Sequence, residues 1–353
     1  MSVITYAEAI RQAMSEEMRR DENVIFMGED IGTYCGAFGV SKGMLEEFGE
    51  SRVIDTPISE TAYVGAGIGA AVTGMRPIVE LMFSDFVAVC YDQLINQAAK
   101  MHFMFAGKVS VPMVIRTAAG GGTGAAAQHS QSLEQAYCNI PGLKVVFPVT
   151  PYDAKGLMNS ALQGTDPVIF FESQRLYGIG EQFHEGGVPE GYYEIPIGEP
   201  YVKRVGKDVT FLTIGATLYR ALKAADMLKE KYGLEAEVID ARSLVPFDYG
   251  KVIESVKKTG RIIIAGDASA RGSFLNDLAA NIADLCFDYL DAAPAVLGSR
   301  NWITPCHELE EAFFPQPEWF LDIINEKMVP LPGYVPTGNF TAAQQIIRAK
   351  KGV

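Results

Sequence analysis

The chain has 353 residues, of which 48% are hydrophobic and 21% are charged, so it can form two domains that each bury a core. Its formal net charge of -13 argues against a nucleic-acid partner and against an anionic membrane surface. The five cysteines are scattered without a CxxC pair, which is typical of a reducing compartment. Because no apolar stretch reaches roughly 18 residues and the first residues lack a signal-peptide core, we expect a soluble cytoplasmic protein.

The first half of the chain alternates predicted helices and strands. Helical periodicity or flanking signals predict helices over Tyr6–Arg20, Lys42–Phe48, Val87–Phe105 and Pro151–Leu162. Short apolar runs predict strands over Val24–Met27, Ser51–Asp55, Pro77–Met82, Val111–Arg116, Leu143–Phe147 and Val168–Glu172. This alternation predicts an α/β domain with a mostly parallel sheet flanked by helices, over residues 1–180.

Glu60 is the first candidate for chemistry, because it stands at the start of an uncharged run of small and apolar residues that extends to Thr73. Such a run predicts a buried helix that other backbones approach closely, with Ser59 or Thr61 at its cap. Glu60 then either caps the helix or pairs with a distant arginine, or it is a desolvated carboxyl with a perturbed pKa that serves proton chemistry.

The regular pattern is lost after Tyr177, where glycines and prolines follow in quick succession, and we expect a linker over residues 181–205. A second α/β domain is predicted over residues 206–340. Its strands are expected at Val209–Ile214, Ala236–Asp240, Arg261–Ala265 and Pro294–Leu297, and its helices at Leu218–Tyr232, Tyr249–Thr259 and Gly272–Cys286. Prolines predict an irregular tail after Arg300, closed by a helix over residues 341–353.

His129 is the second candidate, because it follows a loop with four glycines that would let the backbone approach a ligand. A surface histidine explains its position equally well. The chain has no Walker-type phosphate loop, no GxGxxG after a strand and no metal-ligand spacing. The residues alone therefore predict an acidic two-domain α/β protein without a phosphate-binding motif of its own.

Several strings of the chain together resemble one family. They are VIDTPISE, MFSDF, DQLINQAAKM, AAQHSQSLE and PGLKVVFPVTPYDAKGL, and they are similar to the beta subunits of thiamine-diphosphate-dependent 2-oxo acid dehydrogenases and acetoin dehydrogenase. The resemblance covers roughly the whole chain and is weaker after Gly206. It implies a transketolase-like pyrimidine-binding domain followed by a transketolase C-terminal domain.

The resemblance also implies roles for individual residues. Glu60 would hydrogen-bond the aminopyrimidine nitrogen of thiamine diphosphate and favour the imino tautomer that removes the proton from the thiazolium carbon. Phe86 would stack on the pyrimidine, Ile58 would line the same pocket, and Glu29 would be a supporting acid near Glu60. His129 would face the channel and assist proton transfer or acceptance of the two-carbon unit by a lipoyl group.

The same resemblance implies partners and ions. An alpha subunit would hold magnesium and the diphosphate in a two-alpha, two-beta heterotetramer, so this chain alone would be catalytically incomplete. A lipoylated acyltransferase would take up the acyl group. The family often holds potassium on backbone carbonyls, here those of Met113, Ala161, Leu162, Gly164 and Asp166, although Gly164 and Asp166 depart from the residues common there.

The leading functional prediction is oxidative decarboxylation of a 2-oxo acid, with pyruvate as the first choice. Cleavage of acetoin is the nearest alternative, because MFSDF and LINQAAKM are particularly similar to acetoin-type sequences. A non-catalytic homologue and a self-contained single-chain synthase are further alternatives. The presence of Glu60, Phe86 and His129 argues against the first, and the missing diphosphate motif argues against the second.

Overall fold

The computed structural model describes residues 4–338, which form two compact units. Of the described residues, the first unit comprises 4–119, 136–198 and 243–246, and the second comprises 120–135, 199–242 and 247–338. The units are thus not consecutive along the chain, since residues 120–135 group with the second unit and residues 243–246 with the first. The helix expected over residues 341–353 lies outside the described residues.

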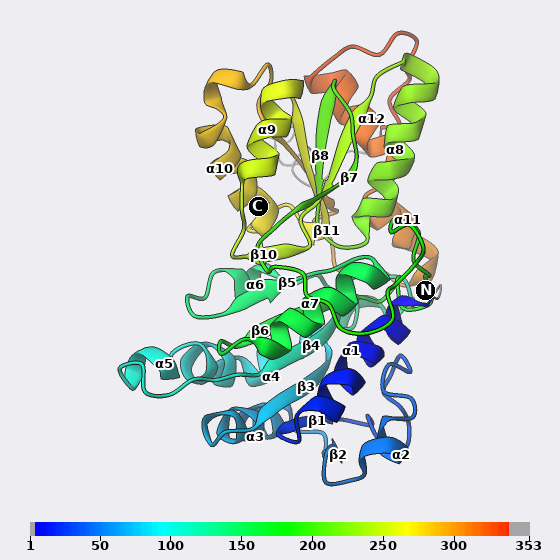
Figure 1. Cartoon of the computed structure of the whole chain (residues 1–353). Helices are drawn as coiled ribbons and strands as arrows, with labels where there is room; N and C mark the ends of the chain where they lie inside the picture. The colour runs from blue at the N-terminus through cyan, green and yellow to red at the C-terminus, as the bar shows by residue number, and fades with distance from the viewer. Residues whose placement is uncertain (1–3, 339–353) are drawn as a thin grey trace. The chain divides into compact units, whose positions relative to one another are not determined.

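The first unit is built on a sheet of seven strands in the order β10-β5-β6-β4-β3-β1-β2 (Figure 1). All neighbours pair in parallel except β10, which is antiparallel to β5. The strands are β1 (Val24–Gly28), β2 (Val53–Asp55), β3 (Arg76–Phe83), β4 (Val114–Ala119), β5 (Lys144–Val146), β6 (Val168–Ser173) and β10 (Ser243–Val245). The parallel sheet predicted from the alternation is therefore confirmed.

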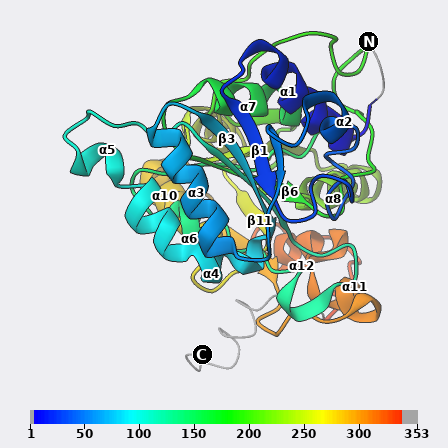
Figure 2. The same cartoon turned by 90° about the horizontal axis from the view of Figure 1, so that it is seen from below.

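Helices cover both faces of this sheet, with α1 and α7 on one face and α3 and α4 on the other (Figure 2). α1 begins at Tyr6, as the apolar period predicts. Thr5 and Glu8 fix this start by forming a reciprocal capping box, in which the Thr5 amide donates to the Glu8 carboxylate at 2.7 Å. The elements are α1 (Tyr6–Arg20), α2 (Met44–Phe48), α3 (Glu60–Val72), η1 (Ser84–Phe86), α4 (Val87–Asp92), η2 (Gln93–Ala98), α5 (Met101–Met104), α6 (Gln135–Cys138) and α7 (Pro151–Gln163).

The buried helix predicted after Glu60 is present as α3, and one of its glycines is required by packing. A Cβ at Gly67 would lie 2.7 Å from the Val79 side chain of β3, so only glycine lets the helix approach the sheet this closely. Gly69 has open space around the position of a Cβ. Close approach therefore explains part of the small-residue run.

The second unit is a sheet of five strands in the order β12-β11-β8-β9-β7, in which only β7 is antiparallel to its neighbour. α8 and α12 lie on one face, and α9 and α10 on the other (Figure 1). The strands are β7 (Tyr201–Arg204), β8 (Val209–Thr213), β9 (Ala236–Asp240), β11 (Ile262–Ser269) and β12 (Ala295–Ser299). The helices are η3 (Ala126–Gln128), α8 (Thr217–Tyr232), α9 (Gly250–Thr259), α10 (Phe274–Leu285), η4 (Phe287–Tyr289), η5 (His307–Leu309), α11 (Glu310–Phe313) and α12 (Pro317–Lys327).

The segment expected to be a linker with short extended pieces contains β7, which pairs with β9. Two other expectations from the sequence are wrong in detail. The single helix expected over Val87–Phe105 is broken into α4, the π-helical η2 and α5, because non-helical geometry at Cys90 and the wider turns of η2 interrupt it. The expected irregular tail contains α12, since a proline in the first turn of a helix needs no donor and Pro317 occupies that position.

Candidate active site

Glu60 lies where the sequence predicts it, at the edge of the first unit formed by the carboxyl ends of β1 and β2. β2 ends at Asp55, a short loop follows, and α3 begins with Glu60, whose side chain is only 8% exposed. Ser59 occupies the N-cap position without a side-chain cap bond, and the Thr61 hydroxyl donates to the Val89 carbonyl instead, at 2.6 Å. Within the described residues Glu60 forms no ion pair with an arginine, and its place in the first turn of α3 is where the helix dipole favours a carboxylate.

A second carboxyl, Glu29, lies beside Glu60. It directly follows β1 and is 6% exposed, and one of its carboxylate oxygens is buried without a hydrogen-bond partner. Burial, followed by the negative charges of Glu60 and Asp30, raises the pKa of Glu29 above its usual range. The sequence assigned Glu29 a supporting position near Glu60, and the structure brings the two acids together.

Two further groups share this acid pair, and sequence reasoning missed them. Burial raises the pKa of the Tyr63 hydroxyl, with the charges of Glu29 and Glu60 adding to the effect. Burial and the Glu60 carboxylate raise the pKa of the Cys90 thiol to about 12. Tyr63 lies one helical turn after Glu60, and this spacing could have predicted that the two side chains are neighbours. The site is thus a desolvated cluster in which protons are held more tightly than in water.

Two apolar side chains flank the acid pair in the chain. Ile58 is 84% exposed, although it lies only two residues before the buried Glu60. Phe86 ends η1 and is half-buried, with its ring 5.7 Å from that of Phe83 in an edge-to-face contact. The Cys90 thiol, whose pKa the Glu60 carboxylate helps to raise, donates to the Phe86 carbonyl at 3.9 Å, so the backbone at Phe86 is linked to the acid pair through Cys90.

His129 belongs to the second unit, whereas Glu60, Glu29, Ile58 and Phe86 belong to the first. It directly follows η3, it is half-buried, and its amide donates to the Ala126 carbonyl at 3.2 Å. Its role in proton transfer or acyl acceptance stays a prediction.

A buried ionic network crosses three neighbouring strands of the first unit, and the sequence analysis did not find it. The Arg116 guanidinium on β4 binds both carboxylate oxygens of Glu172 on β6, each at 2.7 Å, and also binds Glu80 on β3. The Tyr177 hydroxyl donates to Glu172 at 2.9 Å. One ionisable residue inside each of three apolar strands was the signal, because adjacent strands in register place such residues side by side.

The carbonyls assigned to potassium already have partners. Arg76 donates to the carbonyls of Leu162 and Gly164, the latter at 2.8 Å. The Met113 carbonyl accepts from the Val168 amide at 3.0 Å, and the Asp166 carboxylate pairs with Lys144 at 2.8 Å. A carbonyl has two lone pairs, so these contacts leave room for a cation. The part of the chain that the structure describes has no cluster of three His, Cys, Asp or Glu side chains suited to a metal ion.

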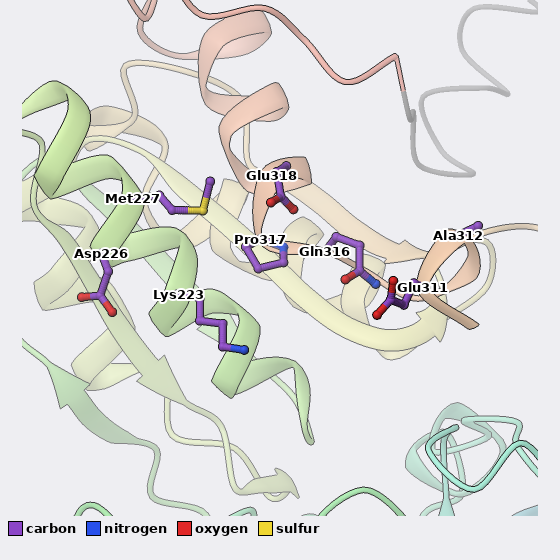
Figure 3. A pocket seen from close by; sticks show the side chains of 8 residues that line it. All are labelled: Lys223, Asp226, Met227, Glu311, Ala312, Gln316, Pro317 and Glu318. Carbon is purple, nitrogen blue, oxygen red and sulfur yellow. The ribbon is translucent and has the colours of Figure 1, made fainter. Parts of the chain in front are cut away.

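A hollow of the second unit lies between α8 and the segment from α11 to the start of α12 (Figure 3). It measures about 740 Å³, and the side chains that line it include Lys223, Asp226, Glu311 and Glu318, all exposed. None of the residues singled out in the sequence lines it. This charged surface groove is therefore separate from the candidate active site.

Two family models match the chain. The transketolase pyrimidine binding domain matches residues 2–179, and the transketolase C-terminal domain matches residues 198–319. A solved split-gene transketolase, described as an inactive beta4 tetramer, is similar with a TM-score of 0.66 over 85% of this chain and 89% of its own. At 22% identity, that similarity concerns the fold.

Curated relatives are more similar in sequence. The beta subunit of acetoin:2,6-dichlorophenolindophenol oxidoreductase from Bacillus subtilis is 46% identical, over 92% of this chain and 97% of its own. The 2-oxoisovalerate dehydrogenase subunit beta of the same organism is 45% identical, over 83% and 88%. The pyruvate dehydrogenase E1 component subunit beta of Rhizobium meliloti is 42% identical, over 92% and 70%.

The two matched domains define the class as transketolase-like. Within that class, the chain belongs to the family of beta subunits of thiamine-diphosphate-dependent 2-oxo acid and acetoin dehydrogenases. The resemblance seen in the sequence is confirmed. No helix among residues 4–338 is long and apolar enough to cross a membrane.

Proposed function

We propose that this chain is the beta subunit of an enzyme that cleaves a carbon–carbon bond next to a carbonyl group and passes the acetyl unit to a lipoyl carrier. The observation that supports this most is the buried acid pair of Glu29 and Glu60 at the start of α3. Thiamine diphosphate would supply the carbon nucleophile and the electron sink for the reaction. The residues present fit its pyrimidine ring, since the first unit holds an unpartnered buried carboxylate oxygen of Glu29, next to Glu60, which could accept a hydrogen bond from the ring.

Each residue of the acid pair has a distinct role in this proposal. Glu60 would hold the ring nitrogen of the aminopyrimidine and supply or accept a proton there. Glu29 keeps its proton to a higher pH than an ordinary glutamate, because burial and the Glu60 charge oppose its ionisation. A protonated Glu29 spares the site a second buried negative charge and positions Glu60. Phe86 and Ile58 would supply the apolar contacts to the ring.

Acetoin is the substrate we place first, with pyruvate second. The relatives named for acetoin are 46% and 50% identical to the chain, and the relative from Rhizobium meliloti named for pyruvate is 42% identical. Both substrates deliver the same acetyl unit to the lipoyl disulfide, which opens to a thioester and a thiol. They differ in the fragment released, which is acetaldehyde from acetoin and carbon dioxide from pyruvate.

The proposed enzyme is complete only with an alpha subunit, in a two-alpha, two-beta assembly with magnesium and the diphosphate held by the alpha chain. Several large apolar side chains of the first unit support such a partner, because they are exposed on α4, on α5 and just before α3. They are Ile58, Val89, Phe103 and Met104. A lipoylated acyltransferase is the proposed acceptor of the acetyl unit.

Copurification with the alpha subunit, followed by titration with thiamine diphosphate and magnesium, tests this proposal. We expect binding to the mixture and not to the isolated chain. Glu60→Gln keeps the shape of the side chain and removes its proton exchange, so turnover should fall at least about 100-fold while assembly stays intact. Glu311→Gln removes an exposed carboxylate and serves as the matched control. Turnover of the Glu60 variant near the wild-type rate would refute the proposed role.

A further inference from the structure

A small hollow of the second unit lies at the carboxyl ends of β11 and β12. It measures about 120 Å³ and is lined by Ser130–Leu133, the ends of the two strands, Trp302, and Phe313 and Phe314 at the end of α11. In open α/β sheets ligands bind outside the carboxyl ends of the strands, and the hollow lies on that side of the sheet, next to the β11–β8 pair at which the strand order reverses. We call it the serine-lined hollow, after Ser130, Ser132 and Ser269.

The three serine hydroxyls of the hollow have no hydrogen-bond partner within the described residues. Ser130 is fully buried, Ser132 is 9% exposed, and the hydroxyl oxygens of all three residues are buried. Leaving one buried hydroxyl unpaired costs about 1–3 kcal/mol, and buried polar groups in native proteins are nearly always paired. Three such groups around one hollow therefore indicate a polar occupant that accepts hydrogen bonds.

The charges around the hollow indicate that this occupant is an anion. Arg271 and Arg300 both line it, and Arg300 is 1% exposed with its guanidinium 3.9 Å above the Trp319 ring. Burial lowers the pKa of Arg300 to about 10 in spite of the Asp322 carboxylate, so an additional negative charge would stabilise the guanidinium.

One carboxylate, Asp267, also lines the hollow, but its charge is already balanced. The Thr217 hydroxyl donates to Asp267 at 2.8 Å, and Arg220 lies 3.8 Å from the same oxygen. Arg271 therefore adds a positive charge at the hollow that this carboxylate does not offset. The volume also limits the size of the anion, since 120 Å³ corresponds to about four water molecules at roughly 30 Å³ each.

We propose that the serine-lined hollow binds the phosphoryl group of a small phosphorylated metabolite. Three hydroxyl donors and the Arg271 guanidinium match a tetrahedral oxyanion with several acceptor oxygens better than a flat carboxylate with two. The proposal uses residues of the second unit only and does not depend on the proposed dehydrogenase function.

Inorganic phosphate is the probe, added to the full chain in complex with its alpha partner and without thiamine diphosphate. We expect phosphate to raise the melting temperature in a saturable way, and acetate or chloride at equal ionic strength to leave it unchanged. Ser130→Ala and Ser132→Ala should weaken phosphate binding at least about tenfold, measured by calorimetry. Without phosphate, the two variants should melt at or above the wild-type temperature, because each removes an unpaired buried hydroxyl.

Arg271→Ala should weaken phosphate binding as well, whereas Lys223→Ala, which removes a charge from the groove between α8 and α12, should not. Three results would overturn the proposal. One is a rise of the melting temperature with acetate or chloride that equals the rise with phosphate. Another is an unchanged phosphate affinity in the Ser130→Ala/Ser132→Ala double variant. The third is a melting temperature of Ser130→Ala well below wild type without phosphate, since the hydroxyl would then make a structural bond.

Discussion

Glu134→Gln should stabilise the protein at alkaline pH and leave its stability unchanged at acid pH. Glu134 precedes α6, is 1% exposed, and has one carboxylate oxygen buried without a hydrogen-bond partner among the described residues. Burial raises the pKa of Glu134 from its ordinary value of 4.5 to about 7, with a smaller contribution from the charge of Asp267. The folded state therefore holds this proton more tightly than the unfolded chain does.

The sign and size of the effect follow from proton linkage. Because the folded-state pKa is raised, the stability contributed by Glu134 is fully present below pH 4.5 and is lost as the pH rises through about 7. Each pKa unit corresponds to about 1.4 kcal/mol, so the ionised side chain costs the folded state about 3 kcal/mol above pH 8. Glutamine has the same shape and never ionises, so Glu134→Gln avoids this cost.

Urea unfolding of the two proteins between pH 4.5 and pH 8.5 measures the difference. We expect equal free energies of unfolding at pH 4.5 and a gap that opens to about 3 kcal/mol by pH 8, with unchanged m-values. For Glu311→Gln, at an exposed position, the difference in free energy of unfolding from the wild type should not vary with pH over the same range. A Glu134→Gln difference that does not vary with pH would refute the reasoning, because it would show that Glu134 titrates alike in the folded and unfolded states.

Three further predictions follow from the first unit. Arg116→Met should lower the free energy of unfolding by about 3–5 kcal/mol, because it leaves the carboxylates of Glu80 and Glu172 buried together. A loss below about 1 kcal/mol in urea unfolding would contradict this. Cys90 should resist iodoacetamide at pH 8 in the folded protein, because burial raises the pKa of its thiol to about 12. The exposed Cys306 should be modified under the same conditions. Equal rates of modification of the two thiols, measured by mass spectrometry, would contradict this. Replacing sodium chloride by potassium chloride at equal concentration should raise the melting temperature if the carbonyls at the end of α7 hold potassium, and equal melting temperatures would exclude that ion.

Local patterns in the sequence predicted most elements of the fold. The capping residues Thr5 and Glu8 and a regular apolar period define α1 without help from the rest of the chain. The uncharged run after Glu60 likewise predicted a buried helix with an acid at its start, and the structure places that acid out of solvent. Local signals sufficed here because capping and amphipathic period act over a few residues.

The sequence could not predict the arrangements that depend on residues far apart in the chain. The grouping of residues 120–135 with the second unit, and of Ser243–Val245 with the first sheet, comes from long-range contacts that no local pattern carries. The interruption of the helix expected after Val87 has the same origin, since apolar period alone does not distinguish a π-helical segment from an α-helix.

The sequence by itself determined the alternation of elements, the family and the position of Glu60 at the start of a buried helix. Only the tertiary structure decided which charges share a buried space, namely Glu29 with Glu60, Arg116 with its two carboxylates, and Glu134 with Asp267. The physical reason is that burial sets the energy of a charge, and burial depends on which strands and loops pack around it.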